Sequence, residues 1–159
     1  MTAFAIRTLR ASDVAAMIPL NAQVQKLHAE ALPHRFHANP DDAEVQARFR
    51  NWLQTEGVTV FGATAGDRLI GYAVFEIIET QDKLFTKGER FGFLHHIVVD
   101  TRHRRKGIGL SLIERGKQSL RETGIQRLEA SYWAFNGASR HLMARAGLCP
   151  SEIFVEGRL

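Results

Sequence analysis

The chain has 159 residues, a length that fits one domain of ordinary size, and we expect a single domain over residues 1–159. A hydrophobic content of 45% beside 24% charged residues is typical of a globular protein and argues against a disordered or fibrous chain. The net charge of +4 suits an anionic partner, but it does not distinguish nucleic acid from a phosphorylated small molecule.

The sequence contains no run of about 18 apolar residues, and its first residues lack a basic stretch followed by an apolar core and a cleavage site. We therefore expect a cytoplasmic protein without a membrane partner. The single cysteine, Cys149, excludes an internal disulfide.

The first part of the chain predicts a strand followed by a helix. Apolar and polar residues alternate over residues 4–9, which is typical of a strand. Ser12-Asp13 supplies an N-cap, and apolar residues then recur at helical spacing over residues 14–27. Pro19 lies inside this stretch, so we expect a kink or a break there.

A second helix follows a polar segment over residues 28–39. Pro40-Asp41-Asp42 places a proline and two acids at a helix start, and Gly57 is expected to end the helix. Between them, apolar side chains mark one helical face: Val45, Phe49, Trp52 and Leu53.

The middle of the chain predicts three consecutive antiparallel strands. Residues 58–64 and 69–79 are rich in β-forming residues and flank a short glycine turn, Ala65-Gly66-Asp67-Arg68. A polar stretch then precedes a third apolar run over residues 91–99.

The last third of the chain predicts two helices, and each helix is followed by a strand. Helical spacing over residues 108–120 ends at Gly124, and residues 128–133 are typical of a strand. Asn136 opens a further helix that Gly147 closes, and Ile153 to Val155 suggest a last strand. The expected order is therefore β-α-α-β-β-β-α-β-α-β.

A basic cluster stands directly before two glycines. Arg102-His103-Arg104-Arg105-Lys106 leads into Gly107-Ile108-Gly109, between a strand and a helix. Exposed amide groups at such a helix start converge on one point, and the helix dipole adds about half a positive charge there. Gly107 would let the backbone approach a ligand without a Cβ, and Gly109 would let the helix start lie close to the strand. This arrangement favours a pyrophosphate.

Two other phosphate-binding motifs do not fit. A Walker loop requires Gly-x-x-x-x-Gly-Lys-Ser/Thr, and the sequence contains no such string. A dinucleotide fingerprint requires a third glycine where Leu112 stands and normally follows the first strand of a parallel unit.

The stretch from Val98 to Ile113, VVDTRHRRKGIGLSLI, resembles motif A of the GCN5-related N-acetyltransferases. The family signature Gln/Arg-x-x-Gly-x-Gly/Ala is matched by Arg104, Gly107 and Gly109. The stretch from Tyr132 to Leu148, YWAFNGASRHLMARAGL, resembles the family's next conserved block, with Asn136 and Gly147 at the expected separation. The order of elements also matches over nearly the whole chain. The resemblance implies an α/β (α+β) fold with a mixed, mostly antiparallel central sheet flanked by helices.

The resemblance also implies an acetyl-CoA site. In this family the cosubstrate lies in an opening between the fourth and fifth strands, where a bulge in the fourth leaves backbone groups free. The implied contacts lie on that strand, on the loop and helix start, and in the second block: Ile97, Val98, Val99, Arg104, Arg105, Lys106, Gly107, Ile108, Gly109, Leu110, Asn136 and Ser139.

Direct attack of a primary amine on the thioester needs no metal, but it benefits from a base, because an alkyl amine is mostly protonated near pH 7. His95 falls where some relatives carry a His and others a Glu, and we take it as the candidate base. His95 and His96 are neighbours on a strand, so only one of them is expected to face the opening. Glu76 is the reserve base. Either histidine could instead be a buried strand residue without a catalytic role.

One departure from the family concerns the tyrosine that usually protonates the departing thiolate. Met143 stands at that position, and Leu148 stands where the family has an aromatic residue. Met cannot donate a proton, although Tyr132, Ser131, Ser139 or water could substitute. An alternative function is therefore a catalytically weak acyl-CoA-binding domain of the same fold.

The acceptor, an amine of a small molecule, peptide or protein, is expected at the first two helices and the loop between them. His28, His34, Phe36, His37 and Trp52 lie there. The three histidines do not have the spacing of a tetrahedral metal site, and a position in a pocket lining or simply on the surface is favoured. Nucleic-acid binding is disfavoured because the chain lacks the usual recognition motifs. Members of the resembled family are often dimers, so we also consider a homodimer.

Overall fold

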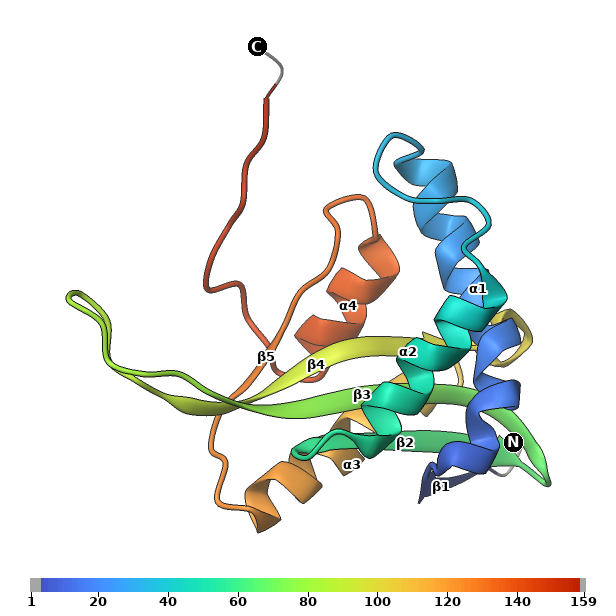
Figure 1. Ribbon diagram of the computed structural model, residues 1–159, viewed down its shortest axis with the longest axis horizontal. Helices are drawn as coiled ribbons and strands as arrows, with labels where there is room; N and C mark the ends of the chain where they lie inside the picture. The colour runs from blue at the N-terminus through green and yellow to red at the C-terminus, as the bar shows by residue number, and fades with distance from the viewer. Residues whose placement is uncertain (1–3, 158–159) are drawn as a thin grey trace.

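The computed structural model describes residues 4–157 and contains one five-stranded sheet with helices on both faces (Figure 1). The strands lie in the order β1-β2-β3-β4-β5; neighbours are antiparallel except β5, which is parallel to β4. The strands are β1 (Ala5–Thr8), β2 (Val58–Ala65), β3 (Arg68–Glu79), β4 (Arg90–Val99) and β5 (Leu128–Ala130). The helices are α1 (Val14–Ala31), α2 (Asp42–Gln54), α3 (Ile108–Glu122) and α4 (Gly137–Arg145), with short 3-10 turns η1 (Ala11–Asp13) and η2 (Thr101–His103).

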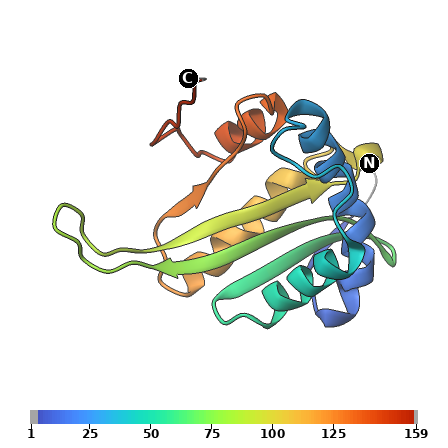
Figure 2. The same ribbon diagram turned by 45° about the horizontal axis from the view of Figure 1, so that its top comes forward.

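The two faces of the sheet bury two separate apolar cores. Side chains alternate along β3, so Tyr72 and Val74 pack with α1 and α2, whereas Ala73 and Phe75 pack with α3. Figure 2 shows α1 and α2 on one side of the sheet and α3 on the other. The mixed, mostly antiparallel sheet expected from the sequence is confirmed.

A bulge interrupts β4 at His95. Phe75 of β3 pairs with Leu94 and Val74 pairs with His96, so His95 has no partner in the ladder. Between Phe75 and Val74, consecutive residues of β3, the partner on β4 therefore moves by two residues, which breaks the alternation of side chains along β4 at this point.

The fourth and fifth strands pair over three residues only. Residues 92–94 pair with residues 128–130, and the β4–β5 ladder ends at Leu94. The remainder of β4, residues 95–99, has no strand partner on the β5 side in the described part of the chain. β4 and β5 therefore stop pairing after Leu94, directly before the bulge at His95.

Most of the expected element boundaries are confirmed. Asp41 caps α2, because its Oδ1 accepts a hydrogen bond from the amide of Glu44 (3.0 Å). Asn136 caps α4 in the same way, with Oδ1 accepting from the amide of Ser139 (3.0 Å). The glycines after α2, α3 and α4 have left-handed backbones with φ near +80°.

Two details expected of the first helix do not occur. The helix does not break at Pro19 and continues to Ala31, with its apolar face packed on the sheet. Asp13 does not cap it with its side chain; its carboxylate instead accepts from the amide of Arg10 (2.8 Å) and from the guanidinium of Arg7 (2.6 Å). Tertiary packing and this ion pair outweigh the local signals.

The predicted last strand does not form. Residues 149–157 contain no helix or strand, although Ile153-Phe154-Val155 has a typical strand composition. β5 is also shorter than expected, because it ends at Ala130 rather than at Trp133. No helix among residues 4–157 is both long enough and apolar enough to cross a membrane.

Candidate functional site

The loop before α3 is anchored by a buried carboxylate. Asp100 is 1% exposed; its Oδ2 accepts a hydrogen bond from Nη2 of Arg68 (3.0 Å), and its Oδ1 accepts from the amide of Arg102 (3.1 Å). Burial opposes ionisation of Asp100, but the bond from Arg102 and the charges of Arg102, Arg68 and His103 hold its pKa below the usual value. Asp100 thereby fixes the end of β4 to the start of the loop.

The start of α3 exposes unpaired amides. Gly107 is the N-cap residue, with φ of +81°, and the first helical bond runs from the amide of Ser111 to the carbonyl of Gly107 (2.9 Å). In the described part of the chain, the amides of residues 107–110 have no acceptor. A Cβ built on Gly107 would meet no atom within 4 Å, so the space on the Cβ side of Gly107 is open.

Cationic side chains surround this helix start. Arg105 and Lys106 are exposed, and Arg105 has a left-handed backbone with φ of +58°. Arg104 turns back toward the sheet, where its Nε donates to the carbonyl of Val99 (3.1 Å). Amides, open space and cations are what a diphosphate requires, so this region fits the diphosphate of a CoA-type cosubstrate.

Gly109 allows α3 to lie close to its neighbours. A Cβ at this position would lie 3.1 Å from Cδ2 of Leu142 in α4 and 3.8 Å from Cγ2 of Val99. The sequence predicted a close approach to the strand, and the tighter contact is with α4.

His95, at the bulge of β4, lies beside Glu76 of β3. Nε2 of His95 lies 2.5 Å from Oε2 of Glu76, and the two side chains are 26% and 32% exposed. The ring of His95 lies 4.9 Å from that of Phe93 and 6.4 Å from that of Trp52 in α2. The pair is therefore accessible to solvent and lies on the side of the sheet covered by α1 and α2.

His96 also faces α1 and α2, which corrects the expectation that the two histidines point in opposite directions. Its ring stacks on Tyr72 at 5.4 Å and lies 6.0 Å from Trp52. Burial, with a smaller contribution from the charge of His28, lowers the pKa of His96 to about 4. The bulge breaks the alternation and so places both histidines on this face, where His95 is exposed and His96 is half-buried and neutral near pH 7.

An aromatic group connects the α1–α2 loop to the β5–α4 loop. We define this group as His28, Phe36, Trp133 and Phe135. His28 lies 5.0 Å from Phe36 and 5.8 Å from Phe135, and Phe36 lies 5.3 Å from Trp133. The guanidinium of Arg35 stacks over Trp133 at 4.9 Å. Burial lowers the pKa of His28.

Sequence reasoning missed Trp133 and Phe135, although both stand in the block YWAFN that precedes α4. The three histidines of the first loop do not converge. Among residues 4–157, no group of three or more His, Cys, Asp or Glu side chains could hold a metal ion.

Met143 is a core residue. It is 4% exposed and belongs to the apolar core between α3, α4 and the sheet, and Leu148 packs against the same core. The position that carries a tyrosine in many members of the resembled family therefore offers no proton donor here. Tyr132 is 36% exposed and Ser139 donates its amide to Asn136.

Several solved structures share this fold at low sequence identity. A tetramutant of the BH1408 protein from Bacillus halodurans has a TM-score of 0.90 at 19% identity, over 98% of this chain and 99% of that one. The aminoglycoside-type enzyme AAC(6')-Iy, in complex with the bisubstrate analogue CoA-S-monomethyl-acetylneamine, has a TM-score of 0.76 at 21% identity, over 99% and 98%. A ribosomal-protein-alanine N-acetyltransferase from Brucella melitensis has a TM-score of 0.70 at 24% identity, over 99% of both chains.

The fold and the open helix start together define a domain of the acyl-CoA-dependent transferase type. The sequence model of the acetyltransferase (GNAT) family matches residues 21–148, and the chain belongs to this family. Acetyl transfer from acetyl-CoA is accordingly its general activity. The family resemblance drawn from the sequence is confirmed. No curated protein sequence matches the chain.

Proposed function

We propose that this protein transfers the acetyl group of acetyl-CoA to a primary amine by direct attack of the amine on the thioester. The observation that carries the proposal is the arrangement of β4: its second half, residues 95–99, has no partner on the β5 side, begins at the His95–Glu76 pair and ends at the loop that leads to the free amides of α3. One strand thus connects a candidate phosphate site to a candidate base.

The cosubstrate would be held by backbone groups more than by side chains. The amides of residues 107–110 and the cations of Arg105 and Lys106 would bind the diphosphate. The edge of β4 at Ile97 and Val98 that has no partner on the β5 side would bind the pantetheine arm, as an added strand binds a sheet edge. Asn136 uses its Oδ1 to cap α4, which leaves its amide nitrogen for a ligand.

The tautomer of His95 follows from its partner. An ionised carboxylate can only accept hydrogen bonds, so Nε2–H of His95 donates to Oε2 of Glu76. Nδ1 then carries the free lone pair and is the atom that would take a proton from the amine. Glu76 stabilises the positive charge that the ring gains in this step.

Acetyl-CoA supplies an activated acetyl thioester. Attack by the amine nitrogen forms the amide bond and breaks the C–S bond, with the electron pair leaving on sulfur. His95 removes the proton that the amine nitrogen must lose. A thiolate with an ordinary pKa near 8.5 leaves without an acid, so the absence of a tyrosine at position 143 is compatible with turnover.

The acceptor would lie between Trp52 and the aromatic group, next to the His95–Glu76 pair. Arg48 stacks over Trp52 at 4.9 Å and Arg35 over Trp133, so cations flank this surface at both ends. Such surroundings favour an acceptor amine with an apolar body over one that carries many positive charges.

Release of free thiol from acetyl-CoA tests the proposal, measured with a panel of amines that includes arylalkylamines, a polyamine, an aminoglycoside and a peptide with a free N-terminus. We expect turnover with at least one acceptor, and His95→Ala should lower that turnover by about 100-fold at pH 7.

The buried position of Met143 motivates a second candidate, a domain that binds acyl-CoA without efficient catalysis. The same assay separates the two candidates. Tight acetyl-CoA binding by calorimetry, together with no thiol release for any acceptor, would favour the second.

A further inference from the structure

Arg48 of α2 is a cation at the edge of the proposed acceptor site. Its side chain is exposed, and its guanidinium lies 4.9 Å from the centre of the Trp52 ring, one helical turn later. The ring of Trp52 lies 6.4 Å from the ring of His95. One aromatic ring therefore connects Arg48 to the candidate base, and the charge of Arg48 acts on any acceptor that lies against Trp52.

Arg48 has no counter-ion in the described part of the chain. Glu44 lies four residues earlier on α2, a spacing that favours a helical ion pair, but the two side chains form none. The guanidinium turns toward Trp52 instead. Arg50 on the same helix, in contrast, donates a hydrogen bond to Oε1 of Gln46 (3.4 Å). The positive charge of Arg48 therefore stays available to an anion from outside the chain.

Stacking on Trp52 leaves the hydrogen-bonding edge of the guanidinium free. A guanidinium stacks through its flat face and donates hydrogen bonds within its own plane. Among residues 4–157, no group accepts a hydrogen bond from the side chain of Arg48. The N–H fork of an arginine matches the two oxygens of a carboxylate. Trp52 therefore holds Arg48 in a form that can bind a carboxylate.

The other charged groups named at this surface already have partners. Arg35, which stacks over Trp133, forms an ion pair with Glu156 of the tail, residues 149–157 (3.4 Å). The carboxylate of Glu76 binds His95. An acceptor with a negative charge would therefore meet an unpaired cation only at Arg48.

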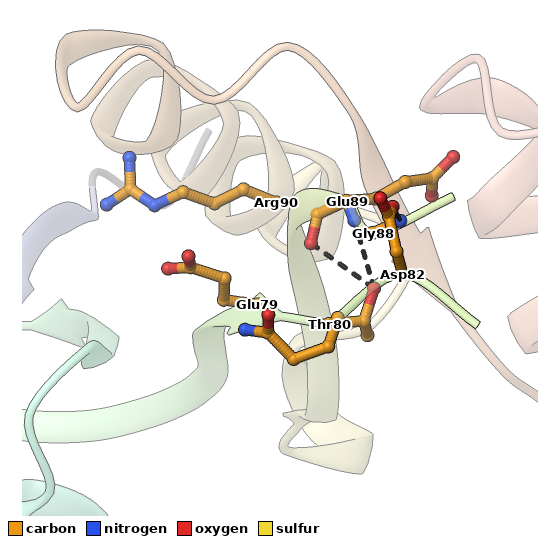
Figure 3. Close-up of a pocket in the computed structure, with 7 residues that line it drawn as sticks. Glu79, Thr80, Asp82, Gly88, Glu89 and Arg90 are labelled. Atoms are coloured by element: carbon orange, nitrogen blue, oxygen red, sulfur yellow. Dashed lines mark hydrogen bonds between the residues drawn. The ribbon is translucent and has the colours of Figure 1, made fainter. Parts of the chain in front are cut away.

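A charged hollow elsewhere on the molecule differs because its groups bind one another. It lies at the base of the arm, residues 80–89, which connects β3 to β4 (Figure 3). The amide of Thr80 donates to the carbonyl of Glu89 (2.9 Å), and the Glu89 carboxylate pairs with Arg127. Oδ1 of Asp82 accepts from the amide of Gly88 (2.5 Å). These contacts hold the arm in place, and we assign no ligand to the hollow.

We propose that the acceptor carries a carboxylate in addition to its amine, and that Arg48 binds this carboxylate. The assignment rests on the proposed function, since it names the acceptor class of the same reaction. The amine lies at His95, the apolar body lies against Trp52, and the carboxylate lies at the guanidinium edge. The substrate class is then an aromatic amino acid or a short peptide that begins with one. Arg48 determines specificity and does not touch the reacting atoms.

Matched acceptors that differ in the carboxylate test this assignment. Phenylalanine is compared with 2-phenylethylamine, and phenylalanyl-glycine with its amide, so the carboxylate lies close to the amine in one pair and farther away in the other. In at least one pair, kcat/KM for thiol release should be about 10-fold higher with the carboxylate, as expected for one exposed charge-assisted contact. Arg48→Gln should reduce this ratio to about one. Arg50→Gln, on the same helix, should leave the ratio at its wild-type value.

The outcomes separate this assignment from the proposed function. Thiol release with ratios that Arg48→Gln does not change would overturn the carboxylate assignment and leave acetyl transfer intact. Absence of thiol release with every amine would contradict the proposed function, and calorimetry on the CoA-loaded protein then tests Arg48 alone. N-acetylphenylalanine should bind about 10-fold more tightly than its amide, and Arg48→Gln should remove the difference. Equal affinities in the wild type would overturn the assignment.

Discussion

Nε2 of His95 and Oε2 of Glu76 lie 2.5 Å apart, although the two residues are 19 positions apart on different strands. Glu76 pairs with Phe93, and His95 follows Phe93 by two residues, so regular alternation places the His95 side chain on the same side of the sheet as Glu76. The bulge at His95 then brings His96 to that side as well. The pair combines a ring that can accept a proton with a carboxylate that orients the ring, which supports the proposed role of His95 as a general base.

His95→Ala should lower kcat for the best acceptor by about 100-fold at pH 7, as expected for loss of a general base. The deficit should shrink as the pH rises, since the acceptor amine then loses its proton to solvent. A pH–rate profile from 6 to 10 checks this prediction, with the exposed His34→Ala as the matched control. Equal deficits at all pH values would remove His95 as the base.

Glu76→Gln should lower kcat less than His95→Ala, because the neutral amide can still hold the ring but cannot stabilise its charge. The double variant should be no slower than His95→Ala alone, since Glu76 acts through His95. Independent, multiplying effects of the two substitutions would show that Glu76 acts on the substrate by another route.

The backbone conformation of the loop before α3 and the order of elements up to α4 were predicted from the sequence because both depend on local signals. Gly107 takes a left-handed backbone at a helix start. Asn136 caps α4 by accepting a hydrogen bond from the amide of Ser139, three residues later in the chain. Such features are encoded within a few residues.

Long-range features were harder to predict. The orientation of His96 depends on a bulge, and nothing in the run LHHIVV places the bulge at His95 rather than one residue later. The aromatic group depends on contacts between two loops about 100 residues apart. The tail has the composition of a strand, but a strand forms only where an edge is available to it.

Gly107→Val should weaken CoA binding by about 100-fold, which corresponds to losing two charge-assisted hydrogen bonds of about 1.5 kcal/mol each. The β-branched side chain disfavours the left-handed backbone and fills the open space before the amides. Gly124→Val is the matched control, because Gly124 has the same φ of +81° and an equally open Cβ direction, but lies after the C-terminus of α3. Calorimetry with CoA on both folded variants decides the matter; equal affinities would contradict the assigned site.

His96 should make the protein less stable in mild acid. Its pKa is lowered to about 4 by burial, whereas the unfolded chain binds a proton near pH 6.5. Between these values the unfolded state binds more protons, so the free energy of unfolding falls with decreasing pH, by at most about 3 kcal/mol from this group.

Urea unfolding at pH 7, 6 and 5 measures this slope. His96→Leu should flatten it, and the exposed His34→Gln should not. Part of the slope should remain in His96→Leu, because burial also lowers the pKa of His28. An unchanged slope in His96→Leu would show that His96 is protonated equally in both states.

Phe36→Ala should raise KM for the acceptor several-fold while leaving KM for acetyl-CoA unchanged. Phe36 contacts both His28 and Trp133, so its loss removes contacts within the aromatic group. This group lies at the proposed acceptor site, and the proposed acetyl-CoA site does not include it. Phe85→Ala removes an equally large ring at the tip of the arm and serves as the control. Steady-state kinetics with each substrate varied in turn would contradict the assignment if the two KM values rose together.

A crystal structure with bound CoA tests the central claim most directly. We predict that the diphosphate accepts hydrogen bonds from the amides of residues 107–110. We also predict that the pantetheine arm follows residues 95–99 of β4, along the edge without a β5 partner, toward His95. A diphosphate bound elsewhere, or a thiol that ends far from the His95–Glu76 pair, would contradict the account.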